Sequence, residues 1–195
     1  MDLYFIRHGQ IDSNINKIYA GWSDESLNPL GKTQAKQAGF ALRKENITKL
    51  YCSPIKRTYE TAAIIGSITG QIPVIEESFK ELCLGPWEGL SEDQIALKYP
   101  DQWEIWNKTP ADLLMKGRES LDDLLKRALK GINKLRLTTG GNIAIVTHVA
   151  IIRVLCLYSI NRGLNNYRDI QVPKNGGIYL LKNERHFKEL NPKKN

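Results

Sequence analysis

The spacing of apolar residues along the chain alternates between the period of a strand and that of a helix. Short apolar or alternating runs predict strands at about residues 2–7, 49–53, 74–75 and 142–147. Apolar residues three and four positions apart predict helices at about residues 28–44, 54–70, 121–135 and 148–159. This alternation is typical of an α/β fold, and we expect three layers: a mostly parallel central sheet with helices on both faces.

Two other parts of the chain depart from the regular alternation. Between about residues 79 and 118, turns around Gly85-Pro86 and Gly89 separate short helical pieces that carry three tryptophans, which predicts a small inserted lid. Toward the C-terminus, three runs predict closing strands, at 168–173, 177–182 and 185–190, followed by a frayed tail at 191–195. Because no linker or internal repeat interrupts the chain, we expect residues 1–195 to form a single domain.

Composition and charge argue against several classes of protein. An apolar content of 42% and a charged content of 25% are typical of a globular protein. The apolar runs are shorter than the roughly 20 residues that a helix needs to span a bilayer. The net charge of +7 is concentrated in residues 101–195, with 17 basic against 9 acidic residues, yet no basic run is interleaved with aromatic residues. We therefore expect no membrane and no nucleic acid as partners.

The few cysteines and histidines limit disulfide and metal chemistry. Cys52, Cys83 and Cys156 are odd in number and lie far apart, which argues against a disulfide framework. Neither residue type shows the paired spacing of a structural zinc site, so we expect no metal and no cofactor. The N-terminus lacks the basic region and apolar stretch of a signal peptide. A reduced, cytoplasmic protein is the simplest interpretation.

Two of the three histidines follow directly after predicted strands. Residues 3–6 lead into Arg7 and His8, and residues 143–147 lead into His148. The carboxyl ends of parallel strands meet at one edge of a sheet, which is where α/β folds bind ligands. Two imidazoles and a guanidinium at that edge predict a site for an anion, and an imidazole is also a capable nucleophile.

Three further segments can contribute polar groups to the same edge. Arg57 lies in the first turn of the helix after the second predicted strand, where a helix N-terminus adds free amides for an anion. Asn14 follows His8 in the next loop, and Glu81 lies near the start of the predicted lid. Such a set of groups is suited to a tetrahedral dianion with a carboxyl group beside it.

At these residues the chain resembles the histidine phosphatase superfamily, the phosphoglycerate-mutase-like group or branch 1. The resemblance covers nearly the whole chain, from Leu3 to about Leu181. It rests on motifs that occur in order and at compatible spacing: Arg7-His8-Gly9, Asn14, Gly21…Asp24…Leu27…Gly31…Gln34-Ala35, Ser53…Arg57-Thr58…Glu60-Thr61, Glu81…Gly85…Trp87-Glu88-Gly89, Glu119-Ser120…Arg127 and Thr147-His148.

The resemblance implies a role for each matched residue. His8 is expected to be the nucleophile that takes the phosphoryl group, with Arg7, Arg57 and His148 around the phosphate. Glu81 is expected to protonate the leaving group and then to activate water, although Glu77 and Glu88 are nearby alternatives. Substrate contacts are expected from Asn14, Gly21 and Trp22. Three tryptophans can either line the mouth of the substrate site or pack in the core or the lid: Trp22, Trp103 and Trp106.

These roles imply an enzyme, a histidine acid-type phosphatase that hydrolyses a small phosphomonoester without a metal. The length of the chain and its tryptophan-rich lid resemble α-ribazole phosphatases and broad-specificity members, which makes α-ribazole 5′-phosphate a candidate substrate. Ile11 and Val149 depart from the family pattern and leave the substrate open. A cofactor-dependent phosphoglycerate mutase is the alternative, although mutases typically have a longer lid. A non-catalytic phospholigand-binding protein is another, and the oligomeric state, monomer or homodimer, stays open.

Overall fold

A mixed β-sheet forms the centre of the molecule. The structure, a computed structural model, describes residues 1–182 and 186–190, and within them six strands form one sheet in the order β3-β2-β4-β1-β5-β6. The strands are β1 (Leu3–Arg7), β2 (Ile47–Cys52), β3 (Pro73–Ile75), β4 (Asn142–Thr147), β5 (Ile178–Lys182) and β6 (His186–Leu190). The first four pair in parallel, whereas β5 and β6 run antiparallel at one side. The sheet is therefore mostly parallel, as the sequence predicts.

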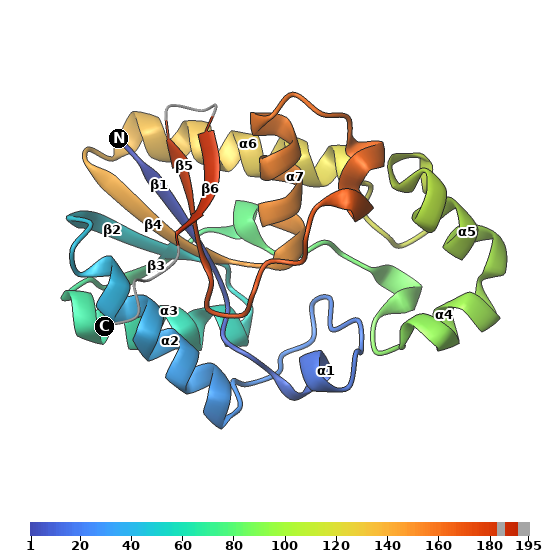
Figure 1. Ribbon diagram of the computed structural model, residues 1–195, viewed down its shortest axis with the longest axis horizontal. Coiled ribbons are helices and arrows are strands. Elements are labelled where there is room, and N and C mark those ends of the chain that lie inside the picture. Colours follow the sequence, from blue (N-terminus) through green and yellow to red (C-terminus); the bar gives the residue numbers. More distant parts are fainter. Residues whose placement is uncertain (183–185, 191–195) are drawn as a thin grey trace.

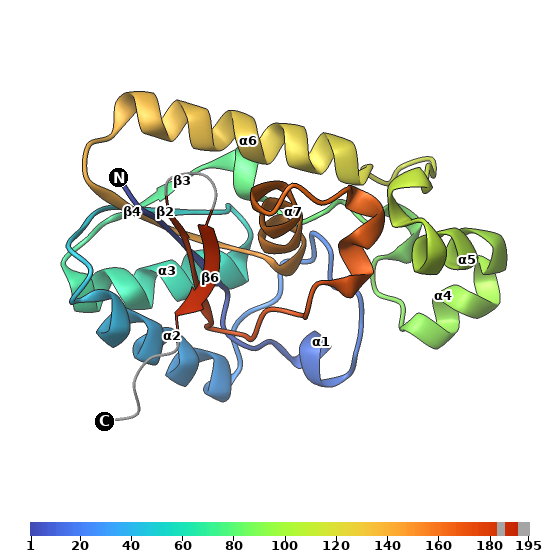
Figure 2. The same ribbon diagram turned by 45° about the horizontal axis from the view of Figure 1, so that its top comes forward.

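Helices cover both faces of this sheet (Figures 1 and 2). One face packs against α2 (Pro29–Leu42) and α3 (Lys56–Thr69), and the other packs against α6 (Leu121–Thr138) and α7 (Val149–Ser159). Successive side chains of β1 point to opposite faces, because a strand has a period of two. Tyr4 and Ile6 accordingly join the core beneath α2 and α3, while Leu3 and Phe5 join the core beneath α6 and α7. The three-layer α/β fold is confirmed.

Short helices make up much of the segment predicted as a lid. They comprise the 3₁₀ turns η1 (Glu77–Phe79), η2 (Gly85–Trp87) and η3 (Pro110–Asp112) and the helices α4 (Glu92–Lys98) and α5 (Pro100–Lys108). Figure 1 shows α4 and α5 at one end of the molecule, beyond α6 and α7. Trp87 is fully buried there, and its ring centroid lies 6.0 Å from that of Trp103 and 6.0 Å from that of Trp106. The tryptophans thus form an aromatic core for this segment.

The prediction of a strand at 168–173 is wrong. Residues Leu164–Asp169 form a 3₁₀ helix, η4, and the chain then continues without regular structure through Pro173. Tyr167 is buried and packs its ring 5.2 Å from that of Trp106, which turns the segment away from the sheet. Pro173 has no N–H for a ladder, and its carbonyl accepts a hydrogen bond from Arg7 instead. The tail predicted at 191–195 lies outside the described residues.

One close backbone approach connects the first strand to α2. The loop after β1 passes directly over the first turn of α2, where Asn28 accepts a hydrogen bond from the N–H of Gly31 at 2.9 Å. A methyl group at Gly31 would overlap the carbonyl oxygen of Gln10, and one at Gly9 would overlap the carbonyl oxygen of Gly31. Glycine is therefore required here because two stretches of backbone touch.

Substitution of this contact tests that constraint. Gly31→Ala should lower the free energy of unfolding by about 2 kcal/mol, because overlap with Gln10 outweighs the better helix propensity of alanine. Gly140→Ala is the matched control: a methyl group there meets no atom within 4 Å, so the change should stay within about 0.5 kcal/mol. Urea unfolding followed by circular dichroism measures both, and equal stability of the two variants would contradict the packing described here.

Candidate active site

The parallel pairing of β1 with β4 brings the two strand-end histidines together. Arg7 and Thr147 are register partners at the ends of these strands, and the N–H of His8 donates to the carbonyl of Thr147 at 3.0 Å. The rings of His8 and His148 consequently lie with their centroids 5.4 Å apart and their planes at 58°. Residues 140 positions apart in the sequence thus form one site.

His8 is held in a defined tautomer and in its neutral form. Its side chain is buried, and Nδ1 lies 2.7 Å from the carbonyl oxygen of Gly9. Because a carbonyl only accepts, Nδ1 carries the proton and Nε2 carries the lone pair. Burial, together with the nearby charges of Arg57 and Arg7, lowers the pKa of His8 well below 6.5. A neutral imidazole with a free lone pair can act as a nucleophile.

His148 is fully buried and has a different environment. Its Nε2 lies 2.8 Å from the hydroxyl oxygen of Ser53, and burial, followed by the charge of Arg57, lowers its pKa well below 6.5. Nδ1 has no hydrogen-bond partner within residues 1–182 and 186–190. If Ser53 donates to Nε2, Nδ1 carries the proton and can donate it to a ligand.

Two arginines place buried positive charge beside the histidines. Arg57, in the first turn of α3, donates from Nη1 to the carbonyl of Ser23 at 2.9 Å and from Nη2 to that of Gly21 at 2.6 Å. Arg7 donates to the carbonyl of Pro173 at 2.6 Å, and burial lowers the pKa of Arg7 to about 10, so it stays charged at neutral pH. In both, Nε is buried with no partner in the described chain, and an anion can take these donors.

Glu81 is a buried carboxyl group on the same cavity. One of its oxygens accepts from the N–H of Leu82 at 2.8 Å and from that of Ala150, at the start of α7, at 3.3 Å. Burial raises the pKa of Glu81, although these hydrogen bonds and the charges of Arg57 and Arg7 oppose the rise. A carboxyl group that retains its proton toward neutral pH can serve as a general acid.

The two arginines and Glu81 face a cavity of about 360 Å³, whose lining residues do not include the buried His8 and His148. Two further lining residues are Asn14, in the short helix α1 (Asp12–Ile15), and Gly21, in the loop that follows this helix. The Oδ1 atom of Asn14 accepts from the side chain of Asn175 at 3.0 Å and from the N–H of Ile11 at 3.3 Å, which fixes the orientation of the amide. Asn175 is a contributor that the sequence analysis missed, because nothing in its polar loop distinguishes it.

Trp22 lies outside this cavity. It is 42% exposed, and its indole N–H donates to the backbone carbonyl of Glu81 at 2.8 Å. The ammonium of Lys80 sits 3.8 Å above its ring. Trp22 thus contacts the backbone of Glu81 from behind the cavity, whereas Trp106, from α5, lines the cavity itself.

Of the three candidate carboxylates, Glu81 alone lines the cavity within the described chain. Glu77 is exposed and pairs with Lys80, 3.8 Å away. Glu88 accepts from the N–H groups of Trp22 and Leu84 at 3.2 and 3.4 Å and therefore connects two loops.

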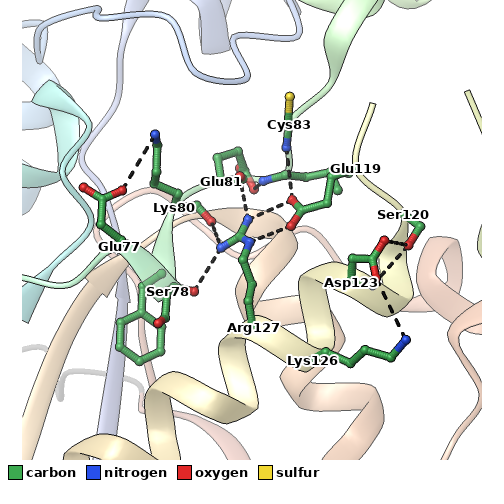
Figure 3. Close-up of polar contacts among 12 residues, drawn as sticks. Glu77, Ser78, Lys80, Glu81, Cys83, Glu119, Ser120, Asp123, Lys126 and Arg127 are labelled. Atoms are coloured by element: carbon green, nitrogen blue, oxygen red, sulfur yellow. Dashed lines mark hydrogen bonds and ion pairs between the residues drawn. The ribbon is translucent and has the colours of Figure 1, made fainter. Parts of the chain in front are cut away.

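A hub around Arg127 supports the backbone of Glu81 (Figure 3). Arg127 projects from α6 and forms a two-point ion pair with Glu119, at 2.6 and 2.9 Å. Its remaining donors bond the carbonyls of Ser78 and Lys80 at 2.9 and 2.8 Å and that of Glu81 at 2.8 Å. The sequence signal was the Glu119…Arg127 pair, whose connection to Glu81 appears only in three dimensions.

Two searches of the described residues complete the account of the site. Within residues 1–182 and 186–190, no group of three or more histidine, cysteine, aspartate or glutamate side chains is arranged to hold a metal ion. None of the helices in the same part of the chain combines the length and the apolar character needed to cross a membrane.

Comparisons with known proteins agree with the fold. The family model for the histidine phosphatase superfamily (branch 1) matches residues 3–192. The chain belongs to this superfamily. It is 33% identical over 162 residues to the 2,3-bisphosphoglycerate-dependent phosphoglycerate mutase of Cytophaga hutchinsonii, covering 80% of this chain and 76% of that one. It is 29% identical over 154 residues to phosphoserine phosphatase 1 of Hydrogenobacter thermophilus, covering 78% and 73%.

The fold of this superfamily member also matches solved structures. A mycobacterial glucosyl-3-phosphoglycerate phosphatase in complex with VO3 superimposes with a TM-score of 0.86 at 25% identity, and the match covers 96% of each chain. The superfamily includes phosphatases and phosphoglycerate mutases, so the comparisons leave the reaction to be argued from the site itself.

The buried histidines predict a pH dependence of stability. Because the pKa values of His8 and His148 are lowered in the folded state, the unfolded state binds more protons just below pH 6.5, and stability rises with pH there. Each histidine should contribute up to about 1.4 kcal/mol per pH unit in this window. The raised pKa of Glu81 has the opposite effect on the free energy of unfolding: the stability that it contributes is lost as pH rises.

Histidine substitutions separate these contributions. Urea unfolding between pH 5 and 7.5, in buffers free of phosphate and sulfate, should show a flatter pH dependence for His8→Gln and for His148→Gln than for the wild type. His186→Gln is the matched control, since His186 is exposed at the start of β6. If all three variants keep the wild-type slope, the two histidines are not held neutral by burial.

Proposed function

We propose that this protein is a metal-independent phosphomonoesterase that hydrolyses a small phosphorylated metabolite through a phosphohistidine at His8. The observation that carries the proposal is the combination of a neutral imidazole and a protonatable carboxyl, His8 and Glu81, beside two buried guanidinium groups. Burial produces both shifts: it lowers the pKa of His8 and raises that of Glu81.

In the first step, the lone pair on Nε2 of His8 forms a bond to phosphorus while the bond to the ester oxygen breaks. Glu81 gives its proton to that oxygen, and the leaving group departs as an alcohol. Charge accumulates on the three remaining phosphoryl oxygens, where Arg7 and Arg57 supply positive charge and the neutral His148 can donate a hydrogen bond from Nδ1.

In the second step, the ionised Glu81 accepts a proton from water as the water oxygen attacks phosphorus. The phosphorus–nitrogen bond breaks, which returns the lone pair to His8 and releases inorganic phosphate. The carbonyl of Gly9 holds the Nδ1 proton through both steps, so that His8 returns to its original tautomer.

Two alternatives have weaker support. A phospholigand-binding protein needs the arginines but neither a nucleophile in the correct tautomer nor a general acid. A mutase is favoured by the 33% identity to a phosphoglycerate mutase, but the second histidine is followed here by Val149-Ala150 and not by the Gly-Asn usual in mutases. Among phosphatase substrates, α-ribazole 5′-phosphate remains a candidate, because the tryptophan-rich segment at 79–118 resembles that of α-ribazole phosphatases.

Trapping the covalent intermediate tests the mechanism. Wild-type protein quenched with alkali during turnover should carry an acid-labile phosphate on His8, and His8→Ala should lose at least about 10⁴-fold in kcat, as expected when a nucleophile is removed. Hydrolysis should continue in excess EDTA. Circular dichroism checks that the variant is folded.

Two results would contradict this mechanism. Substantial turnover by His8→Ala would exclude a phosphohistidine at this residue. Interconversion of 2- and 3-phosphoglycerate, primed with 2,3-bisphosphoglycerate and faster than phosphate release, would assign the mutase reaction instead.

Removal of the general acid should depend on the leaving group. Glu81→Gln should reduce hydrolysis of an alkyl phosphate by about 10²- to 10⁴-fold, because its alkoxide is a poor leaving group. Loss on p-nitrophenyl phosphate should be much smaller, since nitrophenolate leaves without a proton. Glu77→Gln, an exposed carboxylate four residues away, is the control and should change neither rate. Both losses are measured as kcat/KM, which reports only the steps up to departure of the leaving group and so excludes the second step, in which Glu81 acts as a base. Equal losses of kcat/KM on the two substrates would indicate that Glu81 is structural.

A further inference from the structure

The cavity contains more positive charge than a phosphoryl group needs. Within the described chain, four arginines line it: Arg7, Arg57, Arg153 and Arg168. The first two lie beside His8, where the phosphoryl group is placed. Arg168 has a partner in the protein, because its Nη1 lies 3.7 Å from a carboxylate oxygen of Glu92. Arg153 is the cation that remains to be explained.

Arg153 lacks a counter-ion. Its Nε atom is buried and has no hydrogen-bond partner, and no carboxylate lies within ion-pair distance, in the part of the chain that the structure describes. Its guanidinium carbon lies 5.0 Å from the ring centroid of Tyr167. Burial raises the pKa of Tyr167, so this side chain stays neutral: it offers Arg153 a hydrogen bond and a cation–π contact but no negative charge. A guanidinium facing a cavity in this state is suited to bind an anion.

Arg153 also lies on the side of the cavity where the leaving group must be. It is three residues after Ala150 on α7, and Ala150 donates its N–H to the carboxyl of Glu81. Residues three apart share one face of a helix, about 4.5 Å apart along its axis. Both Arg153 and Glu81 lie close enough to Tyr167 to affect its pKa, which Arg153 lowers and Glu81 raises. The proton donor and the unpaired guanidinium therefore border the same part of the cavity.

We propose that Arg153 determines specificity by binding an anionic group on the leaving group of the substrate. This inference rests on the proposed phosphatase function and narrows its substrate class to small phosphomonoesters with a second anion. Because Arg153 is only one helical turn from the group that holds Glu81, the anion belongs within a few bonds of the ester oxygen. A carboxylate on a short carbon chain fits this spacing, whereas the leaving group of α-ribazole 5′-phosphate is uncharged.

Matched substrates test the inference on the wild-type enzyme. 3-Phosphoglycerate and glycerol 3-phosphate differ only in a carboxylate against a hydroxymethyl group. We expect kcat/KM for phosphate release to be about 10- to 100-fold higher for 3-phosphoglycerate, the effect of one charge-assisted hydrogen bond. A second comparison, of fructose 1,6-bisphosphate with fructose 6-phosphate, tests whether a second phosphate can take the place of the carboxylate. This phosphate lies further from the ester oxygen, so we expect a smaller difference in kcat/KM.

Variants assign the discrimination to Arg153. Arg153→Met should lose the preference for 3-phosphoglycerate while hydrolysis of p-nitrophenyl phosphate changes less than about threefold, and Arg153→Lys should retain part of the preference. Arg162→Met is the matched control, because it removes the same charge from an exposed position just after α7. Thermal unfolding checks each variant, and if Arg153→Met does not fold, the wild-type substrate pair and Arg153→Lys decide.

The outcomes separate this inference from the proposed function. Equal kcat/KM for the two glycerol derivatives, with phosphohistidine still formed, would overturn the role of Arg153 and leave the phosphatase intact. The role of Arg153 would also be overturned if Arg153→Met lowered kcat/KM equally for p-nitrophenyl phosphate and for 3-phosphoglycerate. If the enzyme discriminates only between the two fructose phosphates, the anion that Arg153 binds is a second phosphate and not a carboxylate. Absence of hydrolysis and of phosphohistidine with every substrate would instead refute the proposed function.

Discussion

Burial of the side chains at the edge where β1 and β4 end is the physical condition on which the site depends. Burial disfavours charge, so it keeps His8 neutral and raises the pKa of Glu81. The same burial cannot neutralise the arginines beside them, because a guanidinium is far more basic to begin with and the pKa of Arg7 is still about 10. One environment thus brings together a neutral imidazole, a carboxyl group with a raised pKa and fixed cations.

The fold and the two histidines were predictable because both depend on local patterns. A buried parallel strand is a continuous apolar run, and the residue after it necessarily lies at the sheet edge, so His8 and His148 could be placed without coordinates. Residues held by tertiary contacts could not be placed in this way. Asn175 comes from a polar loop without a motif, and the segment at 168–173 reads as a strand until Tyr167 is seen packed against Trp106.

The position of Glu81 shows how a distant helix can act on the site. Its carboxyl accepts from Ala150 on α7, while its carbonyl accepts from Arg127 on α6 and from Trp22 in the loop after β1. Three elements therefore fix one residue whose own segment lacks a regular helix or strand, and Figure 3 shows the contact from Arg127 of α6. The acid is on irregular backbone, but the hydrogen bonds around it supply the order that a helix or strand would otherwise give.

The two sides of the cavity have different structural origins, which explains why the family is easier to recognise than the substrate. Beside the histidines, Arg7 and Arg57 come from a strand end and a helix start, and their positions follow from the sheet. Opposite them, Trp106 and Tyr167 come from α5 and η4, which pack on one another away from the sheet. Changes there can alter the space for a leaving group without moving His8. Arg153 lies between the two sides, on a core helix but beside Tyr167, so in the proposed reaction its charge is available to the leaving group.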